Sequence, residues 1–151
     1  MSKVKTLRFG EIDVDDSKII HFEHGIPAFD DEHQFIIIPL EENSPYLFLQ
    51  SLQTPELSFI MTMPFLFFPD YEFNIDDDIM EQMKITSQED LDVYVLITIP
   101  DGDVKAMTAN LIAPVVVNRV AMQGRQVILE RTKYTTKHRL LPDDVNGEGE
   151  N

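Results

Sequence analysis

The sequence predicts a mainly β protein: a small antiparallel β-barrel-like single domain with one short helix. Two observations carry this prediction. Apolar residues alternate with other residues in short runs that turn residues separate, which is typical of strands. Only one stretch has apolar residues at helical spacing. At 151 residues the chain has the size of one domain and buries about 70% of its unfolded surface.

The clearest strands lie between residues 92 and 118. Every second residue from Val93 to Ile99 is Val or Ile, which predicts a strand with one deeply buried face. Residues 100–103 (Pro-Asp-Gly-Asp) supply turn chemistry, and we expect a returning strand over 104–112. Pro114 ends that pairing, because proline has no N–H to donate.

The remaining strands are short, and polar or glycine-containing residues separate them. Residues 10–13 are interpreted as a break after the first strand, and residues 25–29 as a turn. The total is nine or ten strands. The additional strands are expected over residues 4–9, 17–22, 34–40, 46–52, 57–63, 115–120 and 126–131, with a hairpin turn at 123–125.

The helix is predicted after residue 75. Asp76 has the residue type of a helix cap, and Asp77 and Asp78 complement the positive N-terminal end of a helix. Ile75, Ile79 and Met83 recur at a spacing of four and mark the buried face. In the preceding residues 64–71, the aromatic-rich run 65–68 lies between Pro64 and Pro69, so it does not form a regular central strand.

Composition and charge narrow the class of protein. The net charge of −15 makes direct binding of nucleic acid unfavourable, because phosphates are bound by basic surfaces. There is no run of about 18 apolar residues for a membrane span and no secretion signal. The absence of cysteine fits a reducing cytosol, so we expect a cytoplasmic protein. We expect the domain over residues 1–141 and a disordered acidic tail over 142–151.

Metal and catalytic patterns are weak. On a strand, His21 and Glu23 share one face while His24 points away, and the positions of Asp76, Asp77 and Asp78 lack calcium-loop spacing. The chain has no cysteine nucleophile, no Gly-x-Ser-x-Gly motif and no glycine-rich phosphate loop. We therefore predict a protein that is not an enzyme, with no catalytic residue, metal or cofactor.

Protein binding is the remaining chemistry. The aromatic residues 65–71 suit either a core or an interface, and both interpretations stay open at this point. The acids that follow them make a suitable rim for a partner that is both basic and apolar. The partner-binding residues predicted on this basis are Phe68, Tyr71, Glu72, Asp76, Asp77 and Asp78.

Five short motifs stand in order along the chain: Phe22-x-x-Gly25-Ile26-Pro27-x-Phe29, Leu49-Gln50-Ser51, Pro69-Asp70-Tyr71, Asn110-Leu111-x-Ala113-Pro114 and Gln126-x-Ile128-Leu129. In order and spacing they resemble the FliW family of flagellar assembly factors, over about residues 6–141. Ala28 departs from the family pattern, which often has glycine after the proline.

The resemblance implies a cytoplasmic, non-enzymatic β-barrel-like protein with two protein partners. One is flagellin. The other is CsrA, a small basic RNA-binding dimer that represses translation of flagellin mRNA. FliW bound to CsrA blocks this repression, and accumulated flagellin takes FliW away from CsrA. Two alternatives stay open: a flagellin-specific chaperone without translational control, and a ligand-binding or catalytic small barrel with a polar cavity.

Overall fold

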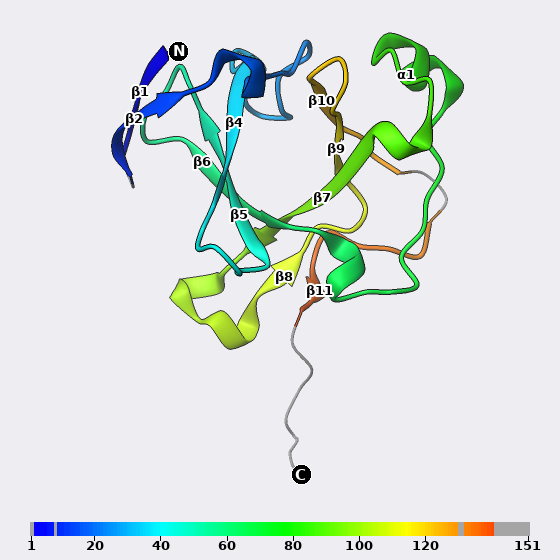
Figure 1. Ribbon diagram of the computed structural model, residues 1–151. Coiled ribbons are helices and arrows are strands. Elements are labelled where there is room, and N and C mark those ends of the chain that lie inside the picture. Colours follow the sequence, from blue (N-terminus) through cyan, green and yellow to red (C-terminus); the bar gives the residue numbers. More distant parts are fainter. Residues whose placement is uncertain (1, 8, 130–131, 141–151) are drawn as a thin grey trace.

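The computed structural model of the protein describes residues 2–7, 9–129 and 132–140. Eleven strands, one α-helix and five 3-10 helices lie in these ranges (Figure 1). The strands are β1 Ser2–Thr6, β2 Gly10–Val14, β3 Ile20–His21, β4 Gln34–Pro39, β5 Tyr46–Ser51, β6 Ser58–Thr62, β7 Leu91–Thr98, β8 Thr108–Ala109, β9 Val115–Asn118, β10 Gln123–Gln126 and β11 His138–Arg139. The helices are α1 Asp77–Gln82 and the 3-10 helices η1 Asp16–Lys18, η2 Pro64–Leu66, η3 Gln88–Asp90, η4 Pro100–Gly102 and η5 Val104–Ala106.

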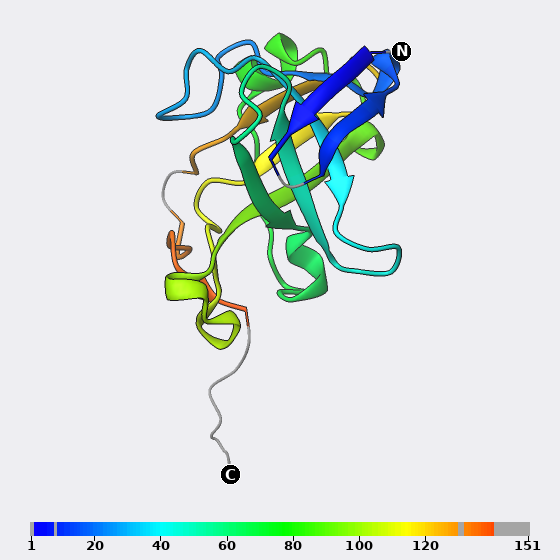
Figure 2. The same cartoon turned by 90° about the vertical axis from the view of Figure 1, so that its left-hand side faces the viewer.

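Seven strands close into a ring. The order β7-β6-β5-β4-β3-β10-β9 returns to β7, because β9 pairs with β7 from Leu91 to Tyr94. In the described ranges every pairing but one is antiparallel; β3 and β10 run parallel and meet at His21 and Gln123. β8 and β11 extend the sheet from the far end of β7, and the β1–β2 hairpin lies outside the ring (Figure 2). The predicted fold class is confirmed.

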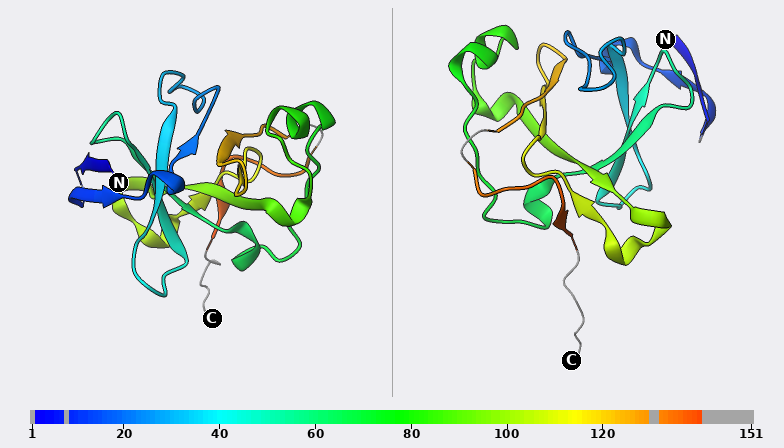
Figure 3. Two further views of the ribbon diagram at one scale, coloured as in Figure 1. Left: turned by 45° about the horizontal axis from the view of Figure 1, so that its top comes forward. Right: turned by 180° about the vertical axis from the view of Figure 1, so that it is seen from behind.

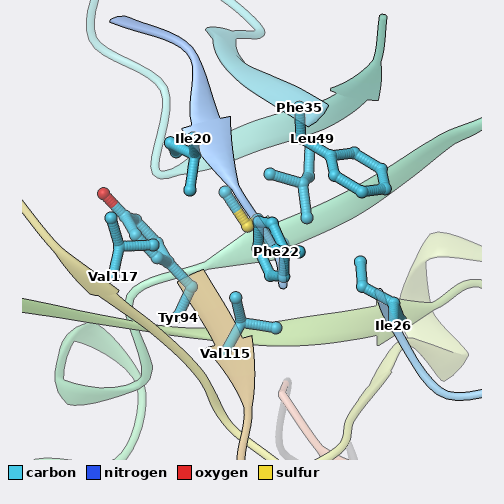
Figure 4. Close-up of a cluster of buried hydrophobic side chains, with 9 residues drawn as sticks. Ile20, Phe22, Ile26, Phe35, Leu49, Tyr94, Val115 and Val117 are labelled. Carbon is cyan, nitrogen blue, oxygen red and sulfur yellow. The ribbon is translucent and has the colours of Figure 1, made fainter. Parts of the chain in front are cut away.

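Inside the ring lies an apolar core to which six of the seven strands contribute, together with Phe22 and Ile26 just after β3 (Figure 4). Phe22 and Phe35 are fully buried and meet edge to face, with ring centres 5.1 Å apart. The buried residues of this inner core are Ile20, Phe22, Ile26, Phe35, Leu49, Met61, Tyr94, Val115 and Val117.

Strand β7 is buried on both faces, although the alternation predicted one deeply buried face. Tyr94 points into the inner core, while Val95 and Ile97 pack outside the ring with Tyr71 and Leu111. The reason is tertiary: residues 64–85, 127–129 and 132–140 lie across the outer side of β7 and cover it (Figure 3).

The predicted hairpin turn at residues 123–125 is wrong. These residues belong to β10, which pairs with β9 from Gln123 to Gln126, and the turn is at residues 119–122. Asn118 Oδ1 closes this turn by accepting hydrogen bonds from the backbone N–H groups of Val120 and Ala121. Gly124 serves packing, because a Cβ atom there would lie 2.5 Å from Phe22 Cζ.

Two other strand predictions need correction. Residues 10–13, expected as a break, form most of β2, and the turn before them is closed by the Thr6 hydroxyl, which bonds to Phe9 N–H and Gly10 C=O. Residues 104–112 hold only the two-residue strand β8, because Asp103 caps the 3-10 helix η5 through Lys105 N–H. The predicted tail, residues 142–151, lies outside the described residues and stays a prediction.

Candidate partner-binding surface

The aromatic residues after β6 build the outer layer. Pro64 opens the 3-10 helix η2, and the chain then turns so that Tyr71 enters the outer core. The Tyr71 hydroxyl donates a 2.7 Å hydrogen bond to the Leu111 carbonyl, and Tyr71 is only 3% exposed. Burial raises the pKa of the Tyr71 phenol, and the neighbouring Tyr134 adds to the increase. Phe68 is half-buried and meets the His138 ring edge to face.

Residues 72–76, here called the strap, lead from this aromatic layer to α1 without regular secondary structure (Figure 1). Glu72 N–H donates to the Tyr134 hydroxyl. The Phe73 and Ile75 side chains pack on a separate hydrophobic cluster beneath the strap. The Asp76 carbonyl accepts the N–H groups of Ile79 and Met80, and its side chain makes no capping hydrogen bond. Backbone geometry therefore starts the helix and leaves the Asp76 carboxylate at the surface.

The end of α1 is anchored to the ring. Asn118 on β9 is 1% exposed, and its Nδ2 donates to the carbonyl oxygens of Met83 and Lys84. Met83 is buried, and Ile75 and Ile79 pack on the same cluster, so the predicted helix face is confirmed. As a result, Asp77 and Asp78 lie exposed on a helix that the ring holds in place.

A groove lies on each side of the strap. The β7 groove has a volume of about 640 Å³, and the β10 groove has about 500 Å³. Glu72, Phe73 and Asn74 line both grooves, so the strap is their common wall. The β7 groove is also lined by Phe65, Tyr71, Ile75, Asp77, Met80, Gln88, Leu91 and Val93, and the β10 groove by Asp76, Ile79, Val127, Ile128, Leu129 and Thr132.

The six predicted binding residues lie on one outer layer but not all at its surface. Glu72, Asp76, Asp77 and Asp78 are exposed, and three of them line a groove. A partner reaches little of Tyr71, so we revise its predicted role from direct anchor to support of the strap.

Sequence reasoning missed the apolar residues that complete this surface. Phe65 is 47% exposed beside the β7 groove, and Ile128 is 64% exposed beside the β10 groove. An isolated apolar residue gives no sign in the sequence that it stays exposed. Phe65, which stands directly after a proline that ends a strand, carried the best available signal.

Charge is strongly segregated along the chain. Residues 19–83 contain thirteen Asp and Glu and no Lys or Arg, whereas the other residues contain fourteen acidic and twelve basic side chains. The described ion pairs join Lys3 to Glu11 and Asp13, and Arg119 to Asp92, so in the described ranges none neutralises the strap. The strap and the start of α1 therefore present acidic side chains without a described ion pair beside the two grooves.

The histidines form no metal centre in the part of the chain that the structure describes, where no three His, Asp or Glu side chains converge. His21, His24 and His33 are exposed, and His33 Nδ1 lies 2.9 Å from the Phe22 carbonyl oxygen. No helix in the described ranges has the length and apolar character to cross a membrane.

These features define the class: a ring of β-strands whose outer layer has two grooves with acidic residues in their walls. The family model described as "FliW protein" matches residues 3–140. The chain is 46% identical to the flagellar assembly factor FliW of Geobacillus sp. (strain WCH70), covering 95% of this chain and 98% of that protein. It is 40% identical to the flagellar assembly factor FliW of Moorella thermoacetica, covering 97% of this chain and 92% of that protein.

A solved structure, the crystal structure of the flagellar assembly factor FliW, superposes with a TM-score of 0.90 at 43% identity. The superposition covers 95% of this chain and 100% of the chain in that structure. The chain therefore belongs to the FliW family of flagellar assembly factors, which are not enzymes.

Proposed function

We propose that this protein is a cytoplasmic partner switch in flagellar assembly. In this proposal it binds the regulator CsrA, blocks the binding of CsrA to flagellin mRNA, and releases CsrA when flagellin takes its place. Membership of the FliW family supports the flagellar role. The domain of residues 1–141 carries the binding, and no metal, cofactor, membrane or direct nucleic-acid contact takes part.

The observation that carries this proposal is the uncompensated negative charge of the strap and α1. Glu72, Asp76, Asp77 and Asp78 are exposed in a stretch of the chain that has no Lys or Arg. Such a surface attracts a basic partner and repels RNA phosphates from the complex, with a range of about 8 Å at physiological salt. The half-buried Phe68 is proposed as an apolar contact at the edge of this surface.

Calorimetric titration of the protein with purified CsrA at two salt concentrations tests the proposal. We expect binding that weakens at the higher salt concentration, because surface charges are screened. Repeating the titration after saturation with flagellin should abolish CsrA binding. CsrA binding that persists under flagellin saturation contradicts a simple switch.

The triple variant D76N/D77N/D78N tests the residue assignment. Because rim charges contribute mainly to electrostatic attraction, we expect it to fold normally and to need about tenfold more protein to displace RNA from CsrA. The control E41Q/E42Q/D101N removes three exposed acids from turns far from α1 (Figure 1). Equal antagonism by the two variants contradicts the assignment.

The flagellin-specific chaperone remains the second candidate, favoured by exposed apolar side chains on and beside η2. Met63, Phe65 and Leu66 are 41%, 47% and 60% exposed, which suits an aggregation-prone apolar segment. Flagellin binding without any CsrA binding in the same titrations would replace the switch by this candidate.

A further inference from the structure

The first half of β7 has an open edge. Backbone groups of successive residues in a strand point to opposite sides. Arg119 N–H donates to the Asp90 carbonyl at 2.9 Å, so even-numbered residues of this segment face β9. Asp92 and Tyr94 pair with β9 accordingly, and the backbone groups of Leu91 and Val93 point the other way.

That other side is covered by β6 only further along β7. Thr62 pairs with Val95 and Met61 with Leu96, and there the ladder ends. Continuing the register would place Pro64 opposite Val93, and proline has no N–H to donate. The chain turns into η2 instead. Leu91 N–H donates to the Gln88 carbonyl at the end of η3. In the described ranges, no hydrogen bond from this side reaches the Leu91 carbonyl or the backbone groups of Val93.

The β7 groove lies beside this open edge. Leu91 and Val93 are half-buried and line it, together with the apolar side chains of Phe65, Ile75 and Met80. Glu72 and Asp77 stand on its rim. The groove thus combines unpaired backbone groups, an apolar wall and negative charge.

An extended segment matches these features better than a helix does. A helix satisfies its own backbone groups and would leave the Leu91 carbonyl and the Val93 backbone groups unpaired. An added strand instead exchanges hydrogen bonds with them and sends alternate side chains into the groove. Lys or Arg at the intervening positions would meet the rim acids.

We propose that the β7 groove binds an extended partner segment, which adds as a strand to β7 at Leu91 and Val93. Its side chains are apolar at alternate positions and basic between them. The proposal rests on the proposed function only in that the protein acts by binding partner proteins.

Two peptides of identical composition test the geometry. Leu-Lys-Leu-Lys-Leu-Lys-Leu has the strand period and Leu-Lys-Lys-Leu-Leu-Lys-Leu the helix period. Each is titrated into isotope-labelled protein, and amide hydrogen exchange is followed by NMR. We expect the alternating peptide to bind more tightly and to slow exchange of the Val93 amide at least about tenfold. The Asp92 and Tyr94 amides, already bonded to β9, serve as the reference.

The variants V93P and V93A separate the backbone from the side chain. V93P removes the N–H that the added strand needs, while V93A keeps it. We expect V93P to lose binding of the alternating peptide and V93A to retain most of it. The exchange measurement on the unaltered protein decides the question if V93P does not fold.

Three results overturn the proposal: tighter binding of the helix-period peptide, no slowing at Val93 under saturation, or equal binding by V93P and V93A. Failure of CsrA and flagellin to bind in calorimetry is a separate result. It removes the proposed switch, and protection of Val93 by the alternating peptide would still support the edge site.

Discussion

The inner side of β7 is packed more completely than its outer side. Inside the ring, Phe22, Phe35, Leu49 and Met61 are all fully buried around Tyr94 (Figure 4). Outside, the covering layer leaves two grooves and exposes side chains such as Phe65. Closure of the ring accounts for the inner side, because six of its seven strands contribute to one shared core. The outer layer is irregular chain laid over the sheet, and its gaps provide a binding surface.

The largest effect should come from matched phenylalanine truncations on the two sides. F22A removes a fully buried ring, and we expect a loss of about 4 kcal/mol of unfolding free energy. F73A truncates a half-buried ring in the outer layer, where we expect about 2 kcal/mol. Urea unfolding of both variants measures the difference. Equal losses would contradict the comparison.

Overfilling the inner core is the next test. The Cβ of G124A would lie 2.5 Å from Phe22 Cζ and 2.9 Å from Ile20 Cγ2, so we expect a loss of about 2 kcal/mol. G102A is the control for adding a methyl group without contact, since nothing lies within 4 Å of a Cβ there. Its cost comes only from the positive φ of 75°. Thermal unfolding should rank G124A below G102A.

Alkaline pH should lower the stability of the protein, because a buried tyrosine lies on each side of β7. Burial, with the Asp92 carboxylate, raises the pKa of Tyr94 to about 12, above its ordinary value of 10. Below pH 10 the contribution of Tyr94 to stability is fully present. Between pH 10 and 12 the unfolded chain loses this proton while the folded protein keeps it, so stability falls by up to about 1.4 kcal/mol per pH unit.

Replacing either tyrosine by phenylalanine sharpens this test. Y94F should flatten the decrease in stability between pH 10 and 12. Y71F should flatten it too, because burial also raises the pKa of Tyr71, but at neutral pH it should cost about 1 kcal/mol by leaving the Leu111 carbonyl unpaired. Denaturant midpoints across this pH range distinguish the two. A slope unchanged in Y94F would contradict its assignment.

The smallest effect concerns a loop at the rim of the inner core. Ala28 has φ 75°, a conformation that costs an L-residue about 1 kcal/mol and glycine little. A28G should therefore raise the unfolding free energy by about 0.5 kcal/mol. The gain is not larger because the greater entropy of glycine in the unfolded chain offsets part of it. A decrease would contradict the strain.

Local patterns predicted much of the site chemistry but not its shape. Spacing of apolar residues located α1, and the acidic run placed exposed carboxylates at its start. The same reasoning placed Tyr71 at an interface, because an aromatic residue shortly after a proline looks alike in a core and on a surface. Its burial depends on Leu111, forty positions away, whose carbonyl takes its hydrogen bond.

The sequence by itself determined the strand content, the short helix, the acidic character and the family resemblance, because these depend on residue type and local spacing. Tertiary structure alone decided the ring closure through β9, the packing role of Gly124 and the grooves beside the strap. The open edge of β7 depends on both levels. Pro64 denies a donor to Val93, but only the register of β6 against β7 places the two residues opposite each other. Hydrogen-bond partners distant in sequence are set by the fold, and no local pattern encodes them.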